Sequence, residues 1–133
     1  MSTVLEIHSI IRWVIVIVGV LAIIKFAIGW AQKSKFTGAD RGLSSAFTGL
    51  MDLQLLLGLI IIFWGGLVDG LGFPRVRLEH GFAMIIAVVV AHLSARWRKS
   101  GDTLRFRNTF LTILISLLII FAGVAALPGG WTR

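Results

Sequence analysis

The sequence predicts an all-α integral membrane protein, an up-down bundle of four transmembrane helices that forms one domain over residues 1–133. Hydrophobic residues make up 57% of the chain and the mean hydropathy is +0.94, which is the composition of a membrane protein. Four apolar segments each reach the roughly 20 residues that a helix needs to cross a bilayer. The connections between them are short, so consecutive helices are expected to be antiparallel neighbours.

The four predicted spans cover roughly residues 8–31, 44–68, 78–97 and 107–127. The first span is too long for the apolar region of a signal peptide, and no Lys or Arg precedes Arg12. It also lacks a clear small-residue cleavage site, so we expect it to be retained. Glycine and proline in "WGGLVDGLGFPR" end the second span, and "LPGGWTR" ends the fourth.

The basic residues, which give the chain a net charge of +7, gather in two of the three connections. The first connection, "AQKSKFTGADRG", and the third, "ARWRKSGDTLRFR", are rich in Lys and Arg, whereas the second has only Arg75 and Arg77. The positive-inside rule therefore predicts that the first and third connections lie in the cytoplasm and that both termini lie outside. Basic residues at span ends suit lipid headgroups, so we expect a lipid bilayer as partner and no nucleic acid.

The residue types also limit the chemistry that the chain can perform. There is no Cys, which excludes a disulfide framework and a cysteine metal site. The sequence has no Gly-rich nucleotide motif after a strand and no zinc-protease pattern. These absences favour an electron-transfer or accessory subunit over a stand-alone enzyme.

Two histidines begin spans one and three, which both run from outside to inside, and so are predicted to share an outer layer. These are His8 and His80, with Arg12 one turn from His8 and Arg77 beside His80. Two imidazoles at one depth on facing helices suit the two axial positions of a b-type haem iron. The arginines are candidates to pair with its propionates. Alternatively, both histidines are interfacial hydrogen-bonding residues that bind neighbouring glutamates or headgroups.

A second polar layer is predicted nearer the inner ends of the spans. It contains Lys25, Asp52 and His92, which are expected at similar depth and buried inside the bundle, because ionisable groups in spans usually face inward and pair. Asp52 is expected to pair with Lys25, His92 or both. Lys25 has the alternative of reaching the inner interface with its long side chain. Gln54 is a weaker candidate to line a quinone pocket.

Four short motifs, "HSIIRW", "KFTGADRGL", "LQLLLGLI" and "LEHGFAMIIA", occur in this order over nearly the whole chain. With them the chain resembles small four-span bacterial membrane proteins labelled "cytochrome b". The resemblance implies a place in the bacterial inner membrane, haem b and electron transport. Asp52 stands where that family commonly has His before "LQLLLG", so the resemblance implies one haem and not a second, inner one. A more distant likeness is to the two-haem, four-helix b561-type cytochromes, by architecture alone.

Three functions therefore remain open from the sequence. The first is a b-type cytochrome, or a haem-bearing subunit, that moves electrons to or from membrane quinone. The second is a haem-free accessory subunit of a larger respiratory or photosynthetic membrane complex. The third is a small proton-coupled transporter or proton relay that uses Asp52, His92 and Lys25.

Overall fold

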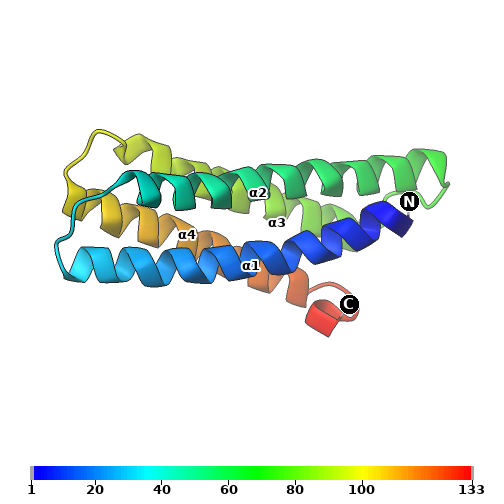
Figure 1. The fold of residues 1–133 in the computed structure, drawn as a ribbon. Helices are drawn as coiled ribbons and strands as arrows, with labels where there is room; N and C mark the ends of the chain where they lie inside the picture. The colour runs from blue at the N-terminus through cyan, green and yellow to red at the C-terminus, as the bar shows by residue number, and fades with distance from the viewer. Residues whose placement is uncertain (1, 133) are drawn as a thin grey trace.

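The computed structural model describes residues 2–132, which form a bundle of four long helices lying side by side (Figure 1). The helices are α1 (Ser2–Ala31), α2 (Gly38–Phe63), α3 (Arg75–His92) and α4 (Asp102–Ala125). Short helical turns follow three of them: η1 (Trp64–Val68) after α2, η2 (Leu93–Trp97) after α3 and η3 (Gly130–Thr132) after α4. Helices α1 and α4 alone, and α2 and α3 together with η1 and η2, are long and apolar enough to cross a membrane.

The helices alternate in direction around the bundle, as the short connections predict. Helix α1 packs against α2 and α4, and α3 packs against the same two, so α1 and α3 lie diagonally opposite each other. Figure 1 shows the α1–α2 and α3–α4 connections at one end, and both termini with the α2–α3 connection at the other. The two basic connections thus share one end of the molecule. That this end faces the cytoplasm stays a prediction.

Every helix begins before the apolar run by which the sequence locates it. The starts are at residues 2, 38, 75 and 102, where the apolar runs suggest 8, 44, 78 and 107. The reason is clearest at α2, where Thr37 and Asp40 form a capping box. The backbone N–H of Thr37 donates to Asp40 Oδ2 at 2.9 Å. Such a cap satisfies backbone donors at the start of a helix and so allows α2 to begin before its apolar run. Helical structure therefore extends beyond the part suited to the hydrocarbon core.

Glycines shape the connection between α2 and α3. Gly70 and Gly72 have φ angles of 70° and 69°, the left-handed region that a glycine enters without the steric cost of a Cβ. Pro74 then precedes the first residue of α3 with φ −61°, a value that its ring fixes. The predicted break in "WGGLVDGLGFPR" is confirmed, and it lies between a π-helical turn and a proline.

The core contains an aromatic cluster towards the end that carries the basic connections. Phe26, Phe36 and Phe106 are buried there, with ring centroids 4.9 Å apart for Phe36 and Phe106. A Cβ added at Gly29 would lie 2.5 Å from Cε1 of Phe106, so the absence of a side chain lets α1 and α4 approach closely. This aromatic cluster fixes α1 against α4 and the first connection.

The outward faces of the bundle are strongly apolar. Large hydrophobic side chains such as Ile17, Leu56, Phe82 and Leu118 are well over half exposed. In water such surfaces would promote association, whereas in a bilayer they are the expected lipid-facing surface. The exposed apolar faces therefore fit contact with lipid.

Candidate functional site

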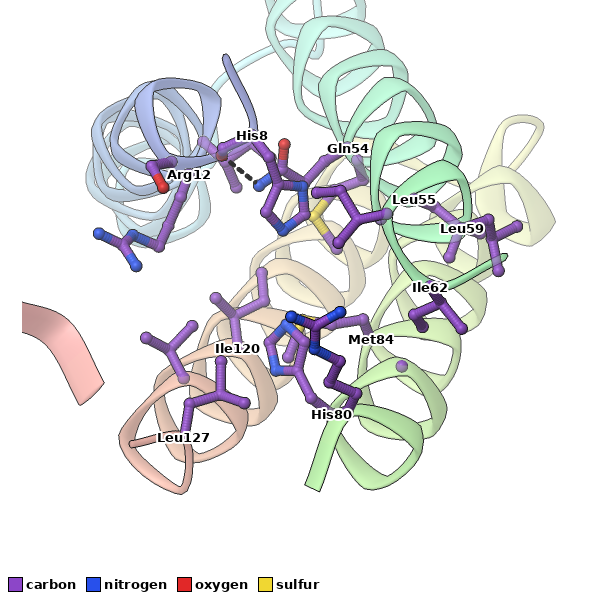
Figure 2. Close-up of a pocket in the computed structure, with 18 of the residues that line it drawn as sticks. His8, Arg12, Gln54, Leu55, Leu59, Ile62, His80, Met84, Ile120 and Leu127 are labelled. Atoms are coloured by element: carbon purple, nitrogen blue, oxygen red, sulfur yellow. Dashed lines mark hydrogen bonds between the residues drawn. The ribbon is translucent and has the colours of Figure 1, made fainter. Parts of the chain in front are cut away.

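A cavity opens between the helices in the half of the bundle that contains the termini (Figure 2). Its volume is about 140 Å³. On the same measure, a volume of about 10–15 Å³ is enough to hold one water molecule. Most of its lining is aliphatic, and the polar side chains are His8, Ser9, Arg12, Gln54, Arg77 and His80. An apolar cavity with a few polar groups is the usual form of a small-molecule or cofactor site.

The two outer-layer histidines enter this cavity from different helices. His8 belongs to α1 and His80 to α3, the diagonal pair of the bundle. Figure 2 shows both imidazoles directed into the space between the helices. The His8 ring lies against α2, where a Cβ added at Gly58 would be 3.4 Å from its Cε1. The structure thus brings together the two histidines that the layer argument places at one depth.

A backbone carbonyl determines which ring nitrogen of His80 carries hydrogen. Nδ1 of His80 lies 3.2 Å from the carbonyl oxygen of Gly123 on α4. Because a carbonyl oxygen only accepts, a ring that makes this hydrogen bond carries a hydrogen on Nδ1. Metal-binding histidines usually have this arrangement, in which the nitrogen that does not bind the metal donates to a carbonyl or carboxylate.

The close approach of α3 and α4 makes this hydrogen bond possible. A Cβ added at Gly123 would lie 2.4 Å from Cε of Met84 and 3.8 Å from Nδ1 of His80. Glycine at this position therefore leaves room for Met84 and allows the carbonyl to reach the imidazole. The sequence contained "FAGVAALPGG" as a span end, but nothing in it indicated that Gly123 would meet His80.

Gln54 provides a polar group at the level of His8. Its Nε2 donates to the carbonyl oxygen of His8 at 2.7 Å and so joins α2 to α1. Its Oε1 is buried and accepts no hydrogen bond within residues 2–132. Buried polar atoms are nearly always hydrogen-bonded, so an acceptor in this position suits a donor from a ligand.

The two arginines predicted beside the histidines have different surroundings. The buried guanidinium of Arg12 lies 5.3 Å from the ring of Trp13 and 5.4 Å from that of Trp131. Figure 2 shows the guanidinium directed away from the two imidazoles, towards the C-terminal segment. Arg77 lies beside η1, since a Cβ added at Gly65 would be 3.1 Å from its Nη1. Arg77 precedes His80 by three residues on α3 and lines the same cavity.

The expected contact between Asp52 and His92 is present, but Lys25 does not join it and pairs with Asp40 instead. Nε2 of His92 lies 2.7 Å from Oδ1 of Asp52, whereas Lys25 pairs with Asp40. Asp40 and Asp52 are twelve residues apart on α2, or about 18 Å of helix rise. The side chains of Asp52 and His92 are 53% and 49% exposed, and that of Lys25 is 48% exposed. The three residues therefore form neither one layer nor a buried one.

Asp40, the partner of Lys25, is the polar residue that the sequence reasoning missed. It is 1% exposed and also accepts from the backbone and hydroxyl of Thr37. Its signal was present in "TGAD", which has the spacing of a capping box, but the segment was assigned to a loop. Once α2 begins at Gly38, Asp40 turns towards α1 and meets Lys25.

The fold and the cavity define a bundle of four helices that are able to span a membrane, with an apolar cavity that two histidines enter from opposite helices. Comparison of the chain with protein-family models, with curated protein sequences and with solved structures finds no match. The functional assignment therefore depends on the residues of the cavity.

Proposed function

We propose that this chain is a b-type cytochrome-like membrane protein, or a subunit of that kind, which takes part in electron transfer with quinone or with a larger respiratory or photosynthetic complex. The observation that carries the proposal is the placement of His8 and His80 on diagonally opposite helices around one apolar cavity. Imidazoles on opposite sides of a space can act as the two axial ligands of a haem iron. A haem bound there would supply reversible one-electron transfer.

The residues of the cavity fit such a group in three respects. The ring of His80 is oriented by the hydrogen bond between its Nδ1 and the carbonyl of Gly123, which is the usual second contact of a metal-binding histidine. Aliphatic side chains such as Leu55, Leu59 and Ile120 provide apolar walls for a flat, apolar ring. Arg77 lines the same cavity and is a suitable partner for a propionate.

Arg12 would have a different role from the one expected for a direct propionate partner. Its guanidinium lies against two neighbouring tryptophan rings, a favourable contact that is worth about 0.5–2 kcal/mol in other proteins. In this position the guanidinium lies at the cavity wall and is directed away from the imidazoles. Its positive charge near the site would favour the reduced form of a bound haem, which carries one more electron than the oxidised form.

The proposal is tested by haem binding to the purified chain. Protein produced with ample haem should show a b-type signal in its reduced-minus-oxidised absorption spectrum. His8→Ala and His80→Ala should each lose six-coordinate haem, because each removes one ligand. His92→Ala is the matched control, since it removes an imidazole that lies outside the cavity. Wild-type protein without any haem absorbance would reject the proposal.

A second candidate, a haem-free accessory subunit of a larger complex, is supported by the surface pair Asp52–His92. Both side chains are about half exposed on α2 and α3, next to exposed apolar residues such as Leu53 and Val89. Ionisable groups in spans rarely face lipid, so a neighbouring subunit over this face would explain the pair. Purification from mild detergent distinguishes the two, because this candidate requires stable partner subunits and no haem.

A further inference from the structure

Three arginines converge at the end of the bundle that carries the two basic connections. Arg41 belongs to the first turn of α2, Arg98 follows η2 and Arg105 belongs to the first turn of α4. Arg105 lies within electrostatic range of both others. We call these three residues the arginine cluster. Segments that are far apart in sequence thus place Arg41 and Arg98 where their charges act on Arg105.

The central member of the cluster rests on the aromatic core. Cζ of Arg105 lies 4.0 Å from the centroid of the Phe36 ring. The backbone N–H of Phe36 donates to Asp102 Oδ1 at 3.2 Å, which ties the first connection to the start of α4. Phe36 is itself buried against Phe106. The Arg105 guanidinium is therefore held on a packed surface, and ordering it for a ligand costs little side-chain entropy.

The cluster has more positive charge than its surroundings neutralise. None of its three guanidiniums makes an ion pair within residues 2–132. The nearby carboxylates are Asp40, which already pairs with Lys25, and Asp102. The three arginines and Lys25 carry four positive charges, and the two carboxylates carry two negative charges. An excess of two positive charges therefore remains. Like charges in proximity repel, and a bound anion would relieve that repulsion.

We propose that the arginine cluster binds the phosphate of an anionic phospholipid headgroup. Guanidinium groups form paired hydrogen bonds with phosphate oxygens, so three of them can surround one headgroup. The cluster lies where the spans end, which is the depth of headgroups, and basic sites between helix ends bind anionic lipids. Exposed Leu93 and Leu104 belong to the same segments and offer an apolar surface for the acyl chains.

The test measures binding of a short-chain phosphatidylglycerol to the full chain in a neutral detergent by titration calorimetry. Arg41→Gln and Arg98→Gln should each weaken binding about five-fold, the contribution of one basic residue near an anionic lipid surface. Arg107→Gln is the matched control. It removes the same charge from the same end of α4, but its guanidinium bonds to Asn108 and is not part of the cluster. The control should change binding less than two-fold.

Two further ligands and one stability measurement separate the possible outcomes. Phosphatidylcholine of the same chain length should bind at least ten-fold more weakly, and inorganic phosphate should not compete at equal concentration. Equal losses in Arg107→Gln and the cluster variants would overturn the site in favour of general charge attraction. Tight binding of inorganic phosphate would overturn the lipid as its source. Far-UV circular dichroism and thermal unfolding check that Arg41→Gln and Arg98→Gln remain folded. The conservative variant Arg98→Lys keeps the positive charge and should bind the lipid more tightly than Arg98→Gln.

Discussion

Gly29→Ala and Gly49→Ala should change the stability of the bundle in opposite directions, although both add one methyl group to a helical glycine. At Gly29 on α1, the new Cβ would lie 2.5 Å from Cε1 and 2.7 Å from Cζ of Phe106. Phe106 is 1% exposed and packs against Phe36, so its ring has little room to move. At Gly49 on α2, a new Cβ meets nothing within 4 Å. The same substitution therefore produces a clash in one place and none in the other.

The size of the difference follows from two effects. Both variants gain helix propensity, which is worth about 1 kcal/mol for Gly→Ala in water and cancels when the two are compared. Adding atoms to a packed core costs about 1–3 kcal/mol, and only Gly29→Ala bears this cost. The free energies of unfolding of the two variants should therefore differ by about 1–3 kcal/mol, with Gly49→Ala the more stable.

The assay is reversible unfolding in mixed micelles, with sodium dodecyl sulfate as denaturant and far-UV circular dichroism as readout. Phe106→Leu combined with Gly29→Ala should be less destabilised than the sum of the single variants, because the smaller side chain relieves the clash. Equal stability of Gly29→Ala and Gly49→Ala would refute the reasoning, since it would mean that α1 and α4 do not pack through Gly29 and Phe106.

Three other experiments probe the Lys25–Asp40 pair, the C-terminal contact and the orientation. Asp40→Asn should lower the free energy of unfolding by about 1.5–3 kcal/mol, the usual contribution of a hydrogen bond to a charged group. The loss should exceed that of Asp52→Asn in the half-exposed Asp52–His92 pair. A smaller loss for Asp40→Asn in micelle unfolding would show that the α2 cap is unimportant. Trp131→Ala should free the guanidinium of Arg12 on one side and speed proteolysis of the C-terminal segment, whereas an unchanged digestion rate would argue against the contact. Cysteines placed at Lys35 and Lys99 should resist an impermeant thiol reagent added outside intact cells, and labelling of either would reverse the predicted orientation.

The helix count and the up-down arrangement follow from the sequence because a bilayer imposes a minimum length on each apolar run. The shared end of the first and third connections follows from that alternation. The sequence also places His8 and His80 in one layer, because each begins a span that runs in the same direction. Depth is readable from sequence position, since every residue of a helix adds a fixed rise.

Rotation of the helices about their own axes could not be predicted in the same way. Spans such as α1 are apolar nearly all round, so no stripe marks the face that turns inward. That is why Asp52 and His92, expected inside the bundle, lie half exposed on its surface. The pairing of Lys25 with Asp40 has a different cause, because Asp40 lies in a capping box that begins α2 before the apolar run by which the sequence locates the span.

The direct test of the haem proposal is the spin state and ligand type of the ferric protein, read by electron paramagnetic resonance. Wild-type protein loaded with haem should give the low-spin signal of two imidazole ligands, and His80→Ala should convert it to a high-spin signal. Met84 lines the same cavity and offers a thioether, so a histidine–methionine pair is the nearest competing ligand set. Absence of any haem signal, or a histidine–methionine signal that persists in His8→Ala, would contradict the assignment of His8 and His80 as the ligand pair.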